Sequence, residues 1–204
     1  MALDHIAVAG ETLEAATEAV ETALGVPVQA GGAHDVFFTH NTLLGLQDGL
    51  YLEAIAINPG APVPDCPRWF DLDRFEGPPR LTNWICRTDD LDGLLTILPT
   101  GAGRAVSLQR GDLHWQMAVP QDGRLPFDNL HPALIQWGGD LHPASMLTQQ
   151  GCRLRRLIIA HPSAEALRAR LGPHLEDSRL VFEPGEHPQM MAEFETPHGR
   201  RVLR

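Results

Sequence analysis

Apolar positions follow one order of spacings along this chain and then repeat it. In the first 60 residues they mark a strand, a helix and three further extended segments, at 3–9, 13–24, around Val28, 36–46 and 50–57. The helical segment has apolar residues three and four apart, with Thr12 before its first turn and Gly25 after its last, as in a capped amphipathic helix. Asp48-Gly49 predicts a hairpin turn between the last two segments. The pattern therefore predicts a β-α-β-β-β module.

The same order returns twice further along the chain. Leu81 and Leu91 stand 78 residues after Leu3 and Leu13, so the strand and helix of the second copy align with the first without gaps. Its predicted elements lie at 81–86, 91–98, 105–109, 113–119 and 133–137, with Thr88 or Asp89 as helix cap and Pro99 among the residues that end the helix. A shorter third copy predicts a strand, a helix and three more strands at 154–160, 163–172, 180–183, 190–196 and 202–203.

These repeats predict an α+β protein with modules at 1–60, 81–140 and 150–204 in one globular unit. The third module is too short to cover its own apolar face, so we expect it to complete the sheet of the other two. An odd number of modules leaves a sheet edge unpaired, which predicts a homodimer. The proline-rich linker between the first two modules carries Trp69 and Phe70 and is expected to pack on the surface.

Composition and charge narrow the class of protein. The formal net charge is -10, from 26 acidic residues against 16 basic residues, all of them arginines, which argues against binding to nucleic acid or to an anionic membrane. Three cysteines without close spacing are neither a disulfide framework nor a zinc knuckle. No signal peptide or membrane-spanning apolar run is recognisable. A cytoplasmic protein that binds a small molecule is the expectation.

Two ionisable residues interrupt the apolar strands of the first module, His5 in its first strand and Glu53 in its last. A buried strand tolerates such a group only when something pairs with it. Two of them in one module suggest a shared ligand, for which a metal ion is the natural candidate. A core histidine bonded to a backbone carbonyl, and an outward-facing glutamate, are the open alternatives, although Glu53 shares its face with Tyr51, Ile55 and Ile57.

Further candidate residues stand near the predicted strand ends. His40 and Asn41 are either a polar turn pair or cleft residues, in which case His40 serves as an acid/base or as a third ligand. His142 follows the predicted strand 133–137 and is the best cleft candidate among the other histidines, with Trp137 near the cleft. The sequence carries no serine nucleophile motif, phosphate loop or dinucleotide fingerprint.

Several short runs, in this order, resemble the vicinal oxygen chelate superfamily, and within it the glyoxalase-like domain subgroup. They are Leu3-Asp4-His5-Ile6, the run Thr39 to Leu46, Tyr51-Leu52-Glu53, and Leu134 to Trp137 followed by His142-Pro143. Glyoxalase I, extradiol dioxygenases, and fosfomycin and bleomycin resistance proteins belong to this superfamily. The resemblance covers the whole chain and implies a curved, cup-like mixed sheet with the helices outside.

The resemblance also implies site residues. Paired modules of that superfamily hold one metal ion, and the matching positions here are His5, Glu53 and Gln136 as ligands. Asn83 matches His5 in the second module, so Asn83 and Gln136 are neutral amides where typical ligands are anionic or imidazole side chains, and amides bind zinc or iron weakly. The implied catalytic residues are Glu53 and His40, and the implied substrate-binding residues are Asn41, Asn83, Trp137 and His142.

The expected function is a metal-assisted lyase, isomerase or dioxygenase that acts on a small oxygen-bearing metabolite in the cleft. A divalent ion would chelate neighbouring substrate oxygens and stabilise a developing enolate. The alternative is a metal-free protein of the same fold that binds or sequesters a small molecule. Glu53 and His5 favour the enzyme, whereas the neutral Asn83 and Gln136 favour the binding protein.

Overall fold

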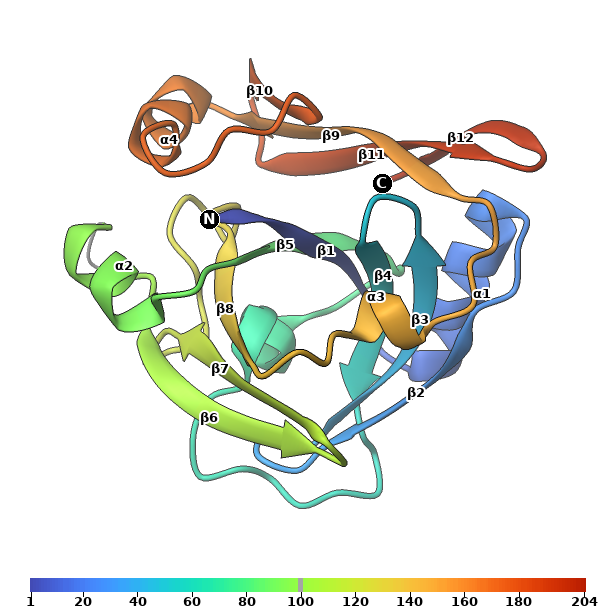
Figure 1. The fold of residues 1–204 in the computed structure, drawn as a ribbon, viewed down its shortest axis with the longest axis horizontal. Coiled ribbons are helices and arrows are strands. Elements are labelled where there is room, and N and C mark those ends of the chain that lie inside the picture. Colours follow the sequence, from blue (N-terminus) through green and yellow to red (C-terminus); the bar gives the residue numbers. More distant parts are fainter. Residues whose placement is uncertain (99–100) are drawn as a thin grey trace.

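The computed structural model describes residues 1–98 and 101–204. Their strands form two sheets, one of eight strands in the order β2-β3-β4-β1-β5-β8-β7-β6 and one of four in the order β10-β9-β11-β12. The larger sheet is curled into a cup, and the smaller one lies across its outer side (Figure 1). Within the described residues, no helix is long and apolar enough to cross a membrane.

The first module has the predicted elements in the predicted order, which are β1 (Ala2–Ala9), α1 (Leu13–Leu24), β2 (Gln29–His34), β3 (Thr39–Leu46) and β4 (Leu50–Ile57). Both predicted caps of α1 are confirmed: the Thr12 side chain accepts a hydrogen bond from the Ala15 amide at 3.1 Å, and Gly25 is left-handed at φ 73°. Strand β3 begins three residues later than predicted because the chain turns at Phe38, whose φ is 50°.

The second module follows the same plan, with β5 (Arg80–Arg87), α2 (Leu91–Ile97), β6 (Arg104–Arg110), β7 (Leu113–Val119) and β8 (Ala133–Gly138). The helix cap is Asp90, whose side chain accepts from the Gly93 amide, rather than Thr88 or Asp89. Pro99, among the residues predicted to end this helix, lies outside the described residues. Antiparallel pairing of β1 with β5 joins the two modules into one sheet.

The curl of the larger sheet brings its two edge strands together. β2 and β6 contact each other, and a Cβ built on Gly32 would lie 2.8 Å from the Cδ of Arg110. One set of apolar side chains lies outside the cup, against α1 and α2, and includes Val8, Val20 and Leu94. A second set fills the inside. The predicted α+β class, with a cup-like sheet and helices outside, is confirmed.

The third segment does not complete the first sheet, contrary to expectation. Its elements are β9 (Arg153–His161), α4 (Ala164–Leu171), β10 (Leu180–Pro184), β11 (Gln189–Thr196) and β12 (Gly199–Leu203), and its strands form the separate four-stranded sheet. The edge strands β2 and β6 contact each other, and neither pairs with a strand of the third segment. The second sheet instead buries the outer face of the cup, where Leu157 and Phe194 join Trp84 in one core.

This shared core predicts what removal of residues 152–204 would do. Leu154, Leu157 and Phe194 would be lost from the core that contains Trp84, which is fully buried. Exposure of such a large apolar face costs about 25 cal/mol for every Å² of apolar surface returned to water. We therefore expect a chain ending at Gly151 to be insoluble or unfolded, as judged by circular dichroism and thermal melts. A soluble fragment with a cooperative melt would contradict this.

The linker between the modules carries a short 3₁₀ turn, η1 (Trp69–Arg74). The linker was expected on the surface, yet Trp69 and Phe70 are both buried in the apolar set inside the cup. The turn can be found in Figure 1 by its colour. Arg68 anchors it by donating to the Phe37 carbonyl at 2.9 Å and to Asp73 at 2.6 Å. The linker is therefore part of the filling of the cup.

Candidate functional site

A bulge in β1 places two consecutive polar side chains at one end of the cup. The pairing of β1 with β5 shifts register between Leu3 and His5, so Asp4 is the extra residue. Normal alternation would send Asp4 and His5 to opposite faces, but here their side chains meet, with 2.6 Å between His5 Nδ1 and Asp4 Oδ1. The local sequence thus gives His5 a carboxylate partner one residue away.

Asp4 is a fully buried carboxylate surrounded by donors. Its Oδ2 accepts hydrogen bonds from His142 Nε2 at 2.9 Å and from Trp137 Nε1 at 3.1 Å, and Arg87 lies 3.6 Å away. Burial alone would raise the pKa of Asp4, but the hydrogen bonds and charges of His142 and His5 hold that pKa well below its usual value. Asp4 is therefore ionised, and both histidines donate to it. The Nε2 of His5 is left facing the inside of the cup.

Glu53 lies beside His5 on the inner face of β4. Its Oε2 is 3.7 Å from His5 Nε2, and its Oε1 accepts a hydrogen bond of 2.5 Å from Asn41 Nδ2. The strand register explains this, because Leu43 pairs with Glu53 and Asn41 is the diagonal neighbour on the same face. Glu53 is buried, with 5% of the residue exposed. One carboxylate oxygen is held by an amide, and the other faces His5.

Asn41 connects Glu53 to two further groups. Its Oδ1 accepts from the Gly32 amide at 2.8 Å and from Arg110 at 3.2 Å, while its Nδ2 also approaches His34 Nε2 at 3.4 Å. The buried His34 has its pKa lowered to about 3, first by burial and then by the positive charges of Arg110, His5 and His40. A neutral His34 can donate from Nδ1 to Thr39 Oγ1, 2.9 Å away, and accept at Nε2.

Gly31 is the position where the backbone depends most on this arrangement. A Cβ built there would lie 2.0 Å from Asn41 Oδ1 and 2.6 Å from the Asn41 carbonyl oxygen, so the amide would have to move. We expect Gly31→Ala to lower the free energy of unfolding by about 1–3 kcal/mol in denaturant titrations. Gly60→Ala is the matched control, since the nearest atom there is 3.7 Å away. Equal effects of the two substitutions would contradict the prediction.

These groups line a small, narrow cavity of about 30 Å³ inside the cup. His5, Glu53, Asn41 and His34 form its polar side. Its apolar side is mainly aromatic and includes Tyr51, Trp69, Phe70, Trp115 and Trp137. Tyr51 stacks on His5, with 4.3 Å between ring centroids, and burial followed by the charges of Asp4 and Glu53 raises its pKa. The cavity therefore combines a carboxylate, an imidazole and a cation, Arg110, within an aromatic wall.

The donor set fits the implied metal ion only in part. His5 Nε2 and Glu53 Oε2 are close enough to share one ion, since metal–ligand distances of about 2.0–2.2 Å bring two ligands within about 4 Å of each other. Within the described residues, however, no group of three or more His, Cys, Asp or Glu side chains is arranged to hold a metal. Arg110 also places a positive charge on the cavity wall. A protein site with three side-chain ligands is therefore not formed, and no chemical step is assigned to a metal.

The structure separates the expected site residues into two groups. His5, Glu53, Asn41 and Trp137 line the cavity, and His142 reaches it through Asp4. Three others do not line it. His40 pairs with Ala56 and alternates with Asn41, so its side chain lies on the outer face, the face from which Thr42 bonds to Thr17 of α1.

Gln136 and Asn83 are the other two expected site residues that do not line the cavity. Gln136 Oε1 accepts from the Leu91 amide at 2.7 Å, so this side chain caps α2 on the outer face. The pairing of Ala7 with Glu53 corresponds to that of Ile85 with Ala133, which makes Ala133 the counterpart of Glu53 in the second module. Asn83 lies opposite Ala7 on the inner face and is fully buried away from the cavity.

The structure brings three residues into this site that were not predicted from the sequence, Asp4, His34 and Arg110. For Asp4 a signal was present, because an acid next to His5 in an apolar strand also needs a partner. His34 and Arg110 stand in segments whose polarity is ordinary for edge strands. The curl that brings β2 and β6 together decides their position, and this curl has no signature in the local sequence.

Comparison with solved structures supports the fold. A hypothetical protein from Staphylococcus aureus is similar with a TM-score of 0.58 and 14% identity, covering 98% of this chain and 83% of that one. Two methylmalonyl-CoA epimerases are more distantly similar. The one from Mycobacterium tuberculosis has a TM-score of 0.44 and 19% identity, with 68% of this chain and 88% of that chain covered. The one from Streptomyces coelicolor is a single-residue variant in complex with 2-nitronate-propionyl-CoA. It has a TM-score of 0.43 and 15% identity, with 68% of this chain and 97% of that chain covered.

Comparison of sequences assigns the family. No curated protein shows significant similarity to this chain. The family model described as glyoxalase-like domain matches residues 3–175, which include both modules of the cup and every residue of the cavity. The repeated modules, the cup-shaped sheet and this match agree with one another, and the chain belongs to the glyoxalase-like domain family of the vicinal oxygen chelate superfamily.

Proposed function

We propose that this protein is a small-molecule isomerase or lyase that moves a proton at a carbon atom next to an oxygen-bearing group. The observation that carries the proposal is the state of Glu53, a buried carboxylate on a cavity wall with one oxygen held by Asn41. Burial of a carboxylate is costly unless hydrogen bonds compensate for it, and such sites are often functional. Glu53 Oε2 is the proposed general base.

Arg110 supplies the complementary charge. Its guanidinium lines the cavity, donates to Asn41 Oδ1, and has no acidic partner in an ion pair among the described residues. When Glu53 removes a proton from carbon, negative charge develops on the neighbouring substrate oxygen. A fixed cation in an apolar cavity stabilises this charge far better than water does. The preferred substrates are therefore small acids or carbonyl compounds with an acidic C–H bond.

His5 is the second group able to move the proton. Asp4 fixes its ring by accepting from Nδ1, so Nε2 faces Glu53 at 3.7 Å. In an isomerisation the proton leaves one carbon and returns to the same or a neighbouring carbon, and a base and an imidazole side by side can perform both transfers. In a lyase the same base removes the proton while a leaving group departs from the adjacent carbon.

A metal-free binding protein is the second candidate. The aromatic side of the cavity, with three of the four tryptophans of the chain, favours it, because such walls hold small organic molecules without chemistry. No metal ion is used here because, among the described residues, no three His, Cys, Asp or Glu side chains are arranged to hold one. The homodimer and the cytoplasmic location stay predictions.

Proton exchange separates the two candidates. The protein is incubated in D₂O with small 2-oxo and 3-oxo carboxylic acids, and loss of the C–H signal is followed by NMR. An enzyme of the proposed kind accelerates this exchange for at least one compound, even when the full reaction needs a different substrate. A protein that shifts the NMR signals of a compound on binding, without accelerating exchange for any, is a binding protein.

A further inference from the structure

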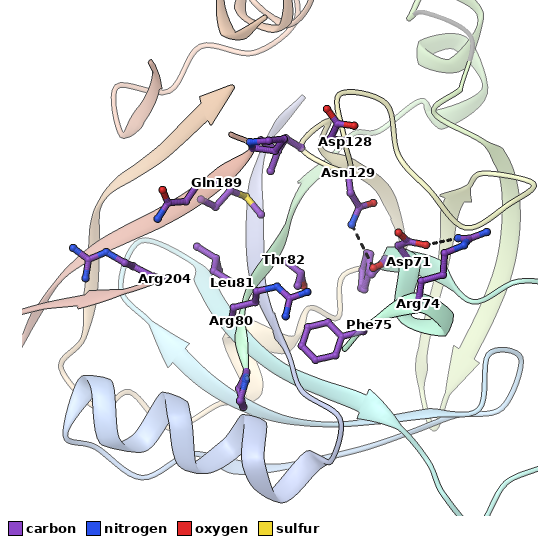
Figure 2. Close-up of a pocket in the computed structure, with 15 residues that line it drawn as sticks. Asp71, Arg74, Phe75, Arg80, Leu81, Thr82, Asp128, Asn129, Gln189 and Arg204 are labelled. Carbon is purple, nitrogen blue, oxygen red and sulfur yellow. Dashed lines mark hydrogen bonds and ion pairs between the residues drawn. The ribbon is translucent and has the colours of Figure 1, made fainter. Parts of the chain in front are cut away.

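The cavity is narrow in this structure, and its 30 Å³ is room for about one water molecule. A substrate of several non-hydrogen atoms can reach Glu53 only if one wall moves. Two walls border open grooves. Trp137 is shared with a groove of about 510 Å³ beside His142 and Arg87. Phe70 is shared with a groove of about 480 Å³ between the linker and β11, shown in Figure 2.

The wall at Phe70 is firmly anchored. Trp69 and Phe70 are buried in the large apolar set inside the cup. The backbone around them is tied to a distant loop, with the Asp71 amide donating to the Gly123 carbonyl at 3.0 Å and Asn129 Nδ2 to the Phe70 carbonyl at 3.3 Å, the latter visible in Figure 2. Moving this wall would disrupt the core of the cup.

Residues 139–150, which form the wall beyond Trp137, are held much less firmly. This segment contains the short helix α3 (Pro143–Met146), whose Pro143 lines the cavity. Its buried residues are Pro143 and Ala144, and Ala144 packs in a small cluster with Leu43 and Tyr51. Segments with few buried contacts and exposed hydrogen bonds open at the lowest free energy.

The remaining attachments of this segment are few: Gln149 forms one isolated β-bridge with Gly45 of β3, and His142 bonds to Asp4. Gln29 exchanges two hydrogen bonds of 3.0 Å with the backbone of Thr148 at the surface. The side chain of Met146 is 62% exposed. Left-handed glycines stand directly at its two ends, Gly139 at φ 78° and Gly151 at φ 75°, where the backbone can pivot. Figure 1 shows α3 beside β3 and β4 at the mouth of the cup.

We propose that residues 139–150 are a movable cover that admits the substrate to the Glu53 cavity and, on closing, makes His142 a positioning residue for His5. The cover carries His142, whose hydrogen bond to Asp4 exists only in the closed position. Asp4 in turn orients His5. Closure thus excludes water and completes the donor set around Asp4 in the same movement. This inference rests on the proposed function, because it assigns the use of the same cavity.

Amide hydrogen exchange of the unmodified protein tests the movement without any substrate. The amides of residues 139–150 are expected to exchange at least tenfold faster than those of 69–74, measured by mass spectrometry. Slower exchange in the cover than in η1 would place the moving wall at Phe70 and overturn the proposal. The result is independent of whether the protein has enzymatic activity.

A disulfide that staples the cover to β3 tests its role. A Cβ built on Gly45 would lie 3.1 Å from Leu147 Cβ, so the two residues need to separate by a few tenths of an ångström to reach the range of about 3.5–4.5 Å found in disulfides. The pair Gly45→Cys and Leu147→Cys is made in a Cys66→Ser background, since Cys66 is the only half-buried native cysteine and the other two are buried. Each single substitution in that background is a control, and non-reducing peptide mapping verifies the bond.

Two readouts follow oxidation and reduction of the staple. Quenching of the fluorescence of the cavity tryptophans by acrylamide should fall several-fold when the disulfide is oxidised and recover when dithiothreitol reduces it. Any accelerated C–H exchange should fall at least tenfold and recover in parallel. Unchanged quenching would overturn the proposal that residues 139–150 form a movable cover. A quenching response in a protein that accelerates no exchange would support the cover while rejecting the proposed function.

His142 is tested by two substitutions of different chemistry. Gln at this position keeps an N–H donor for Asp4, whereas Leu removes it. We expect His142→Leu to speed amide exchange in 139–150 and to lower the turnover rate of C–H exchange at saturating substrate, with His142→Gln restoring much of both. If Gln and Leu behave alike, the bond to Asp4 does not couple the cover to His5, and the positioning role is overturned.

Discussion

Replacement of Glu53 by Gln is expected to lower the rate of C–H exchange by about 10²–10⁴-fold, the usual contribution of a general base. Gln has nearly the same shape, so Asn41 Nδ2 can still donate to a side-chain oxygen at this position. The carboxylate that accepts the proton is lost, whereas the aromatic wall and Arg110 stay in place. NMR exchange rates and thermal melts on the same two proteins measure the chemistry and the fold separately.

Glu18→Gln on the exposed face of α1 is the matched control, because it removes one negative charge from the chain far from the cavity. A loss of several kcal/mol in stability with unchanged exchange would make Glu53 a structural partner instead of a base. Calorimetric titration with divalent metals is a third measurement on the same two proteins, and it gives the affinity for the ion. If the ion implied by the family binds at His5 and Glu53, Glu53→Gln lowers its affinity by an order of magnitude or more.

As the pH is lowered, the folded protein is expected to begin losing stability at a pH well above the range in which carboxylates titrate. His34 has a pKa of about 3 in the folded state against 6.5 for an unperturbed histidine, chiefly because of burial. Between these values the unfolded chain binds one more proton than the folded one, so stability falls as pH falls. The slope is about 1.4 kcal/mol per pH unit, and the full interval is worth roughly 4–5 kcal/mol.

Burial lowers the pKa of His131 to about 4 from its usual 6.5. Between these two values the unfolded chain binds a second extra proton, which adds to the loss of stability. Asp4 acts in a different range, since its lowered pKa removes stability only below the usual titration of an aspartate. Urea unfolding at pH 7, 6 and 5 should therefore show a steep loss of stability.

Substitution isolates the contribution of His34. His34→Gln should reduce the pH slope by about one proton, even if its stability at pH 7 is lower. His187→Gln at an exposed position should leave the slope as it is. An unchanged slope in His34→Gln would mean that His34 is protonated in the folded protein or that another group carries the effect.

The local elements were set by local chemistry and could be read from the sequence. Thr12 and Gly25 fix the ends of α1 because a side-chain oxygen and a left-handed glycine satisfy helix ends without help from the rest of the fold. Asp48 and Gly49 turn the hairpin because both adopt positive φ. His5 and Glu53 were found by the same kind of reasoning, since an ionisable group in a buried strand costs free energy wherever that strand lies.

Strand register decided which neighbours face the cavity. Alternation distinguishes His40 from Asn41 only after β3 is paired with β4, and Gln136 from Trp137 only after β8 is paired with β7. A shift of one residue would have reversed both outcomes. The bulge that brings Asp4 to His5 likewise belongs to the pairing of β1 with β5.

Only the tertiary structure decided the rest of the site. Arg110 and His34 meet Asn41 because the cup closes between its two edge strands, and this depends on the twist and packing of the whole sheet. The strands of the third segment pair with one another in a second sheet, which packs apolar side chains on the outer face of the cup. Sequence thus determined the elements and the two central site residues through short-range energetics, whereas contacts between residues far apart in the chain determined their partners and the shape of the cavity.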